Sequence, residues 1–270
     1  DNKKPEKEPI YESKETLYEK AVKKMERTMQ EKEELEMDHC EETEVHEELL
    51  RIVQEKLPEA ILATYDTKEA EKDPENFARK IARETEWADV IVLGPGIGME
   101  DYARCMVENV LKDAYVPIIL DADALNLAAE YRELTGYFTE NIIVTPHMKE
   151  MSRLTGIQIE EMKENPVRTA REFADQYGVV CVLKDAATVI AGRDGKTFVN
   201  GSGTPAMAKG GSGDVLTGVI AGLVALGLEE SDAAALGVYV HGLAGEAAEK
   251  HFGVHGVLAG EIADCLSEVY

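Results

Sequence analysis

Short apolar segments alternate with longer amphipathic segments along most of the chain. The apolar segments, such as 89–93 (DVIVL) and 117–120 (PIIL), are brief and rich in β-branched residues, which is typical of buried strands. We expect strands at 60–63, 89–93, 117–120, 141–144, 179–184, 188–191 and 196–200, and helices ending near Pro58, at 77–87, 102–112, 125–131, 149–154, 167–177, from Asp214 onward, at 231–252 and at 260–266. Buried strands separated by helices predict an α/β domain whose mostly parallel central sheet is covered by helices on both faces.

The first 44 residues differ from the rest of the chain. They are mostly Glu and Lys, and Leu17, Ala21, Met25 and Met29 form only a thin apolar stripe at i, i+4 spacing. Such a segment buries too little apolar surface to build its own core. We therefore expect a charged arm at 1–44, helical or disordered and without a functional site, followed by a folded domain at 45–270.

The charge of the chain narrows the classes of partner. The sequence holds 29 Lys and Arg against 53 Asp and Glu, which gives a net charge of −24. A field of this sign repels nucleic acid and anionic membranes, so we expect neither as a partner. A ligand that carries phosphate must then be held locally, by backbone N–H groups, by lysines or by a metal ion.

The cysteines and the apolar segments indicate the cellular compartment in which the protein is expected. The four cysteines lie far apart with no Cys-x-x-Cys pair, which predicts reduced thiols rather than a disulfide or zinc framework. No apolar run approaches the ~20 residues that span a bilayer. The charged N-terminus lacks the pattern of a secretory signal. We expect a soluble cytoplasmic protein.

A glycine-rich loop that leads into a helix stands out at 200–227 (NGSGTPAMAKGGSGDVLTGVIAGLVALG). Gly210, Gly211 and Gly213 permit positive φ and close approach of an oxyanion to the backbone. The first N–H groups of the helix have no intrahelical partner and carry partial positive charge, so the loop predicts an anion site. Asp214 would follow in the first turn, where a base can accept a proton from a hydroxyl that attacks the bound phosphoryl group. The alternative is a plain loop in which Asp214 only caps the helix.

The helix after this loop contains Gly218 and Gly222 on one face, one turn apart. Glycine costs roughly 1 kcal/mol at each helical site relative to alanine. The pair therefore predicts close packing of this face against another backbone.

Polar clusters follow four of the expected strands, at 94–98 (GPGIG), 121–126 (DADALN), 145–150 (TPHMKE) and 183–188 (LKDAAT). Ligands of open α/β sheets bind beyond the carboxyl ends of the strands, so these clusters should converge on one crevice. The first cluster lacks the G-x-G-x-x-G spacing of a dinucleotide fingerprint, and the chain has no G-x-x-x-x-G-K-[ST] phosphate loop.

Each cluster also has a structural interpretation. Asp121 and Asp123 could hold Mg²⁺ through water, or Asp123 could cap a helix. A lone histidine such as His147 is more often structural than functional, and the segment after Lys184 could be a plain hairpin. His241, on an apolar helix, is interpreted as a packing residue.

In this order the motifs resemble those of the NAD(P)H-hydrate dehydratases, a branch of the ribokinase-like superfamily. The segment 121–126 matches the family's DADALN letter for letter, and 241–245 is close to its HGLAG. Met148 and Lys149 replace Pro and Gly of TPHPGE, and 183–188 stands where the family has LKGAGT. The resemblance implies a ribokinase-like three-layer sandwich. It also implies ADP- or ATP-dependent dehydration of hydrated NADH and NADPH, with Mg²⁺ and in a homo-oligomer.

The resemblance also implies roles for individual residues. Asp214 would be the catalytic base and would contact the substrate, together with Gly96, Gly98 and His147. Asp121 and Glu150 would bind the metal, if only through water. The nucleotide would contact Lys184, Asp185, Ala186, Ala187, Thr188, Gly210, Gly211, Ser212 and Gly213. Two other functions stay open: a kinase of a small alcohol such as a vitamin precursor, and a nucleotide-binding subunit without catalysis.

One part of the family pattern is not recognisable. Family members open with a strand and a glycine-rich substrate loop ahead of the segment that corresponds to 57–60 (LPEA), and residues 1–44 resemble neither. We therefore expect one wall of the substrate site and one or two strands to be missing. An open strand edge of this kind invites pairing with another chain, so we expect assembly through that edge or poor solubility, with weak activity.

Overall fold

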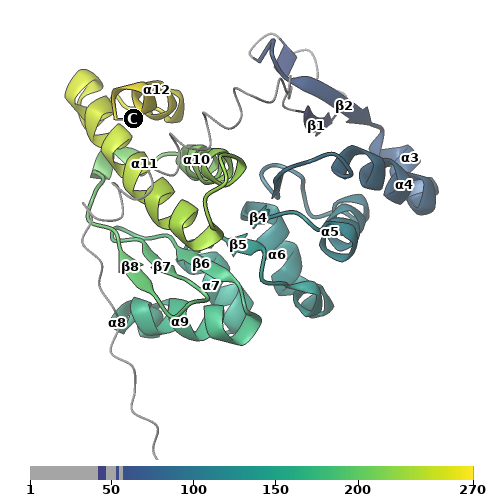
Figure 1. The fold of residues 1–270 in the computed structure, drawn as a ribbon, viewed down its shortest axis with the longest axis horizontal. Coiled ribbons are helices and arrows are strands. Elements are labelled where there is room, and N and C mark those ends of the chain that lie inside the picture. The colour runs from purple at the N-terminus through teal and green to yellow at the C-terminus, as the bar shows by residue number, and fades with distance from the viewer. Residues whose placement is uncertain (1–41, 47–52, 55–56, 270) are drawn as a thin grey trace, which may run out of the picture.

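The computed structural model describes residues 42–46, 53–54 and 57–269, and its centre is a six-stranded sheet (Figure 1). The strands are β3 (Ile91–Leu93), β4 (Ile118–Leu120), β5 (Ile142–Val144), β6 (Val180–Leu183), β7 (Val189–Ala191) and β8 (Thr197–Val199), and they lie side by side in this order. The first four strands are parallel, whereas β7 and β8 run antiparallel to their neighbours. The mostly parallel sheet expected from the sequence is confirmed, and each strand agrees with its expected range to within two residues at either end.

Helices cover both faces of this sheet (Figure 1). One face carries α4 (Pro74–Thr85), α5 (Asp101–Asp113), α6 (Ala122–Glu130), α7 (Met148–Thr155), α8 (Ile159–Glu164) and α9 (Pro166–Tyr177), and the other carries α10 (Ser212–Ala225) and α11 (Glu230–Phe252). The chain then turns back along α11 as α12 (Ala259–Asp264) and the 3₁₀ helix η4 (Cys265–Glu268). The predicted three-layer sandwich is confirmed.

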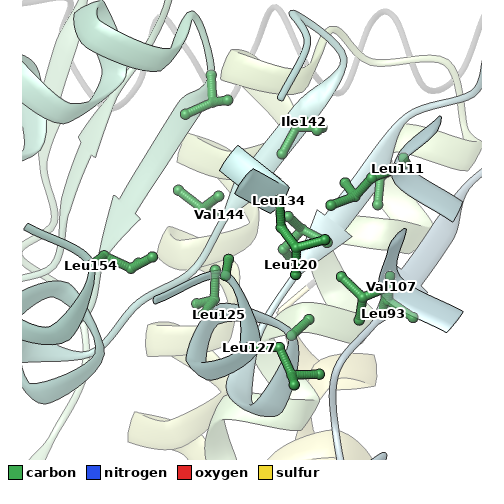
Figure 2. Packing of buried hydrophobic residues seen from close by; sticks show 14 of the residues in the cluster. Leu93, Val107, Leu111, Leu120, Leu125, Leu127, Leu134, Ile142, Val144 and Leu154 are labelled. Atoms are coloured by element: carbon green, nitrogen blue, oxygen red, sulfur yellow. The ribbon is translucent and has the colours of Figure 1, made fainter. Parts of the chain in front are cut away.

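The two faces are built by strict alternation along the strands. In β4, Ile118 and Leu120 pack with the helices α4 to α9, whereas Ile119 packs with α10 and α11. Figure 2 shows part of the first cluster, where Leu120 and Val144 of the sheet lie close to Leu125 of α6. Each fully buried Leu or Ile contributes roughly 1.5–3 kcal/mol. A slip of one residue would move all of these side chains to the opposite face, so the register of the sheet is strongly specified.

Local signals in the sequence set the ends of the helices. The side chain of Asp73 accepts a hydrogen bond from the N–H of Asn76, and Pro74 occupies the first helical position of α4. Asn165 and Pro166 repeat this arrangement at α9, which ends at Gly178 with a φ of 68°. Polar caps, an initial proline and a terminal left-handed glycine are the expected boundaries of a helix.

A second, two-stranded sheet lies apart from the main one. It pairs β1 (Glu42–His46) in parallel with β2 (Ile61–Tyr65), which corresponds to the strand expected at 60–63. The first 41 residues of the predicted arm lie outside the described residues, and its last three belong to β1. Within the described part of the chain, β3 has no strand on its outer side, and its central residue Val92 is 41% exposed.

The structure corrects the interpretation of Gly218 and Gly222. Both are exposed, and a Cβ atom placed on either would meet nothing within 4 Å outside its own helix. Close packing of α10 comes from α11 instead, where a Cβ on Gly237 would lie 2.8 Å from Cγ1 of Ile220. The short helices α3 (Thr67–Lys72) and α8 were not predicted, because their mostly charged sequences (TKEAEK and IEEMKE) show little apolar periodicity. Among the described residues, no helix is both long and apolar enough to cross a membrane.

Candidate active site

The helix α10 begins at the glycine-rich loop, as predicted. Gly211 precedes the helix with a φ of 86°, and no side chain caps the helix at that position. The first N–H groups of this 14-residue helix have no intrahelical partner and can face an anion, and that of Ser212 also donates to the carbonyl of Lys209 at 3.3 Å. Asp214 lies in the first turn and is exposed. Of the three loop glycines that permit positive φ, only Gly211 adopts it.

Gly213 faces the side chains of Lys184 and Asp121 at van der Waals distance. A Cβ atom on Gly213 would lie 3.4 Å from Nζ of Lys184 and 3.8 Å from Oδ2 of Asp121. The start of α10 thus faces the carboxyl ends of β6 and β4, where Lys184 and Asp121 lie. By contrast, a Cβ on Gly210 would meet nothing within 4 Å.

Two glycines of α11 hold the loop that leads to this helix. A Cβ on Gly242 would lie 2.1 Å from Oγ of Ser202, and one on Gly245 would lie 2.2 Å from Sδ of Met207. The hydroxyl of Ser202 donates a hydrogen bond to the carbonyl of Tyr239 at 2.9 Å. The small residues of the 241–245 segment therefore allow the segment that contains Ser202 and Met207 to pack directly on the backbone of α11.

Asp121 is the most buried charged group of the site, at 2% exposure. Its Oδ1 accepts a hydrogen bond from Nζ of Lys184 at 2.6 Å, and its Oδ2 accepts one from the hydroxyl of Thr217 at 2.9 Å. Buried carboxylates are stable only when they are paired in this way. Asp121 follows β4, Lys184 follows β6, and Thr217 lies in α10. Their hydrogen bonds therefore join α10 to the carboxyl ends of two strands.

Asp214 lies within electrostatic reach of the same cluster. Partial burial raises the pKa of its carboxyl group, the negative charge of Asp121 raises it further, and Lys184 opposes both effects. A carboxylate with a raised pKa is a better proton acceptor. Position, exposure and environment therefore suit Asp214 to act as a base.

His147 and Glu150 form a capping box at the start of α7. The Nδ1 atom of His147 accepts hydrogen bonds from the N–H groups of Lys149 and Glu150, each at 3.1 Å. In return, Glu150 accepts one from the N–H of His147 at 2.8 Å. Because Nδ1 is an acceptor here, the neutral ring carries its proton on Nε2. The His147 side chain is about half exposed, at 48%, and can meet a ligand.

Glu150 is buried beneath this box. Burial raises the pKa of its carboxyl group and the negative charge of Asp121 adds to the effect, whereas the His147 backbone and Lys184 lower it. The residues His147 and Lys184 are neighbours across an isolated parallel bridge. Two carboxylates, Asp121 and Glu150, are therefore near enough to repel each other at the site where Lys184 supplies a positive charge.

The loop after β3 approaches the same strand ends. Gly94 has a φ of 126°, and a Cβ on it would lie 1.8 Å from the carbonyl oxygen of Asp121. The N–H of Gly98 donates to Oδ2 of Asp123 at 3.0 Å, so Asp123 fixes this loop. Gly96, with a φ of 69°, has open space before it.

Ala122 separates the two aspartates and has a φ of 47°, the only positive value of a non-glycine residue in the described chain. This conformation costs roughly 1–2 kcal/mol. It directs Asp121 toward Lys184 and Asp123 toward Gly98.

An open cleft of about 520 Å³ adjoins the loop after β3. It is lined by Met99, Asn126, Ala129, Glu130 and Arg153. Arg153 donates a hydrogen bond to the side chain of Asn126 at 2.6 Å, so the 121–126 segment reaches from the buried carboxylate to this cleft.

Only part of the predicted nucleotide-binding segment after β6 (184–188) lies at the site. Lys184 lies in it, but Asp185, Ala186 and Ala187 are exposed in the turn before β7. Thr188 donates its hydroxyl to the carbonyl of Asp185 at 3.3 Å. Among the hydrogen bonds of the described residues, none joins this turn to the loop at 210–213.

Two residues of the site were not predicted. Thr217 lies one turn after Gly213, so its helical spacing from the loop was the available signal. His241 is buried as a packing residue should be, but its Nε2 lies 3.5 Å from Oγ of Ser212. Burial lowers the pKa of His241 to about 4, so it is a neutral support beneath the anion loop.

Comparison with known proteins gives a consistent result. A family model described as NAD(P)H-hydrate dehydratase matches residues 37–268. The bifunctional NAD(P)H-hydrate repair enzyme of Moorella thermoacetica is 43% identical over 182 residues, which are 67% of this chain and 34% of that enzyme. The chain spans less than two thirds of the length of the curated relatives that it matches.

Solved structures agree with the family match. The ADP/ATP-dependent NAD(P)H-hydrate dehydratase of Bacillus subtilis, co-crystallised with ATP and Mg²⁺, superposes with a TM-score of 0.67 at 30% identity, covering 83% of this chain and 76% of that one. A ribokinase-like superfamily protein of Enterococcus faecalis has a TM-score of 0.68 at 27% identity, covering 84% and 75%.

Proposed function

The chain belongs to the NAD(P)H-hydrate dehydratase family, and from this premise we propose that it restores hydrated NADH and NADPH with ADP or ATP as co-substrate. The observation that carries the proposal is the uncapped start of α10 facing the Asp121–Lys184 pair, with Asp214 exposed in its first turn. A site for a phosphoryl group and a base for a hydroxyl then lie side by side.

In the proposed reaction, the hydroxyl of the hydrated nicotinamide ring attacks the terminal phosphoryl group of the nucleotide. Asp214 accepts the proton of that hydroxyl while the N–H groups of Gly211, Ser212 and Gly213 hold the phosphoryl oxygens. The phosphate group then leaves the ring carbon with the electrons of the C–O bond, the neighbouring ring carbon gives up a proton to water, and the double bond of the dihydronicotinamide forms. Lys184 contributes a fixed positive charge beside the transferring group.

The remaining site residues divide between the two ligands. Nε2 of His147 lies 3.3 Å from Oε1 of Glu150, and the half-exposed ring contacts the hydrated dinucleotide. The open space before Gly96 and the backbone of Gly98 receive its nicotinamide end. The exposed turn from Asp185 to Thr188 lies along the adenosine phosphates. The cleft beside Met99 continues from the Gly98 loop and gives room for the rest of the dinucleotide.

The residues present fit Mg²⁺. Asp121 and Glu150 supply hard oxygen ligands, and their carboxylates repel each other, which a cation relieves. Both carboxylates already accept protein hydrogen bonds, so they reach the ion through its water shell. When bound, Mg²⁺ neutralises the charge of the phosphates.

The test is recovery of the NADH absorbance from NADH hydrate, with ADP and with ATP in turn. Recovery with either nucleotide that depends on Asp214 supports the proposal. Transfer of phosphate to a small alcohol without recovery of NADH would replace it with a kinase function. Tight binding of nucleotide with neither reaction would indicate a binding subunit.

We further infer assembly through the open edge of β3, where Val92 is 41% exposed within the described residues. Light scattering and NADH recovery, measured with and without residues 1–40, test this inference. A monodisperse monomer that is fully active in both forms would contradict it.

A further inference from the structure

Three side chains with metal-binding atoms meet at the C-terminal end of the fold, where α12 and η4 lie beside α11 (Figure 1). His251 lies in the last turn of α11, Cys265 opens η4, and Glu268 closes it. Residues i and i+3 of a 3₁₀ helix lie on the same side, which places Cys265 and Glu268 together. Their ligand atoms and those of His251 all lie within 4.8 Å of one another.

We propose that His251, Cys265 and Glu268 bind a divalent transition metal, Zn²⁺, which joins the C-terminal turn to α11. One thiolate sulfur, one imidazole nitrogen and one carboxylate oxygen form a ligand set that suits Zn²⁺ and excludes Mg²⁺ and Ca²⁺. The fourth tetrahedral position belongs to water.

The distances require only a small adjustment. Nε2 of His251 lies 2.9 and 3.1 Å from the two carboxylate oxygens of Glu268. In a tetrahedral zinc site, ligand atoms stand about 3.3–3.6 Å apart, given typical zinc–ligand bond lengths. The imidazole and carboxylate therefore separate slightly as the thiolate moves toward the ion. His251 and Glu268 are about half exposed, whereas Cys265 lies buried beneath them, so the ion enters from solvent onto the sulfur.

The electrostatic surroundings favour a cation. Burial and the negative charges of Glu268, Asp264 and Glu261 raise the pKa of the Cys265 thiol. The carbonyl end of the 23-residue helix α11 adds partial negative charge at His251. Without an ion, His251 and Glu268 form an ion pair, and the Cys265 thiol forms a hydrogen bond with Glu268.

The proposed ion would act on the fold and, through it, on the glycine-rich loop. Cys265 packs in one cluster with Ala244 and Ala248 of α11. At the other end of the same segment, the Cβ of Ala259 lies 3.0 Å from the position a Cβ on Gly211 would take. Holding the segment from Ala259 to Glu268 on α11 therefore also confines the backbone at the start of α10.

The test uses the full chain, free of metal and of any affinity tag. Calorimetric titration with Zn²⁺ should show one site, and Zn²⁺ should raise the midpoint of thermal unfolding. Co²⁺ should give the visible bands of a tetrahedral ion and a thiolate-to-cobalt charge-transfer band. Even partners outside the ligand shell typically change metal affinity 10–100-fold, so Cys265→Ser and His251→Ala should weaken Zn²⁺ at least about a hundredfold.

Matched variants control for other sites. Cys105→Ser and His255→Ala change a thiol and an imidazole outside the cluster, and both should bind Zn²⁺ like the unaltered chain. Glu268→Gln, at an exposed position, serves if Cys265→Ser fails to fold. Loss of the charge-transfer band in Cys265→Ser with retention in Cys105→Ser supports the proposal. Equal Zn²⁺ affinity in the cluster variants and the controls, or no binding at micromolar Zn²⁺, overturns it.

Discussion

The loop at 210–213 and the turn at 185–188 are both candidates for nucleotide contact, yet they are built differently. The segment that leads to the loop packs closely on α11 at Ser202 and Met207, and at Gly211 a Cβ atom would lie 3.0 Å from that of Ala259. The turn is exposed, and it carries a negative charge at Asp185. The loop therefore holds its N–H groups in a fixed geometry that can stabilise negative charge on a phosphoryl group, whereas the turn provides only an exposed contact surface. Catalysis and most of the phosphate affinity should depend on the loop.

The largest effect should come from Asp214. Asp214→Asn should lower the turnover of NADH hydrate by about 10² to 10⁴-fold, because a positioned base is lost. Nucleotide affinity should stay the same or rise, since a charge that repels phosphate is removed. Rates from NADH absorbance and calorimetry with ADP or ATP separate the two effects. More than about a tenth of the original activity would exclude Asp214 as the base.

Gly213→Val tests the loop itself. The new side chain would enter the space beside Lys184 and Asp121 and block the approach of phosphate. Hydrogen bonds to charged groups are worth about 1.5–3 kcal/mol, so ADP or ATP should bind roughly 10–100-fold more weakly. Gly218→Val is the matched control, because Gly218 lies on the exposed face of α10 and its Cβ would meet nothing within 4 Å. Unchanged affinity of the Gly213→Val variant would show that phosphate binds elsewhere.

The buried His241 beneath the glycine-rich loop should make the free energy of unfolding depend on pH. The pKa of His241 is lowered to about 4 from 6.5, so the unfolded chain binds this proton more readily. The resulting stability is present above pH 6.5 and is lost as the pH falls from 6.5 toward 4, which amounts to roughly 3 kcal/mol. Urea unfolding at pH 7 and pH 4 should show this loss in the original chain and a smaller one in His241→Gln. Equal losses would mean that His241 is not held neutral.

His147 has two candidate roles, as a substrate contact and as the cap of α7. His147→Ala should weaken the hydrated dinucleotide more than ADP or ATP, by about tenfold if one charged or strong hydrogen bond is lost. Alanine also removes the cap of α7 and should cost about 1 kcal/mol of stability. His147→Asn keeps a capping side chain and separates the two roles. If the alanine variant weakens both ligands equally, or neither, His147 is only structural.

The sequence predicted the architecture because alternation in the strands and glycine at the helix starts are local signals. It also predicted that Asp121 and Lys184 converge, since parallel strands end at the same edge. The contribution of Thr217 was missed, because its spacing from Gly213 places it one turn into α10 but does not show that the rotation of the helix brings its hydroxyl to Asp121. The expectation for Gly218 and Gly222 was wrong, since a sequence shows where a helix permits close approach but not whether a neighbour is there. The His251–Cys265–Glu268 cluster escaped notice because a reversal of the chain after α11 creates it.

The smallest effect should come from the turn, and it tests whether the turn contacts phosphate at all. Asp185→Gly removes an exposed carboxylate and should tighten ADP or ATP only a few-fold, since exposed charge pairs are worth about 0–1 kcal/mol. The gain should fade as salt is added, because screening weakens repulsion between separated charges. Asp194→Gly, in the hairpin turn between β7 and β8, is the control for loss of one negative charge. An equal gain in nucleotide affinity in both variants would reflect net charge alone. A hundredfold gain in Asp185→Gly would show that the turn contributes as much to phosphate binding as the loop.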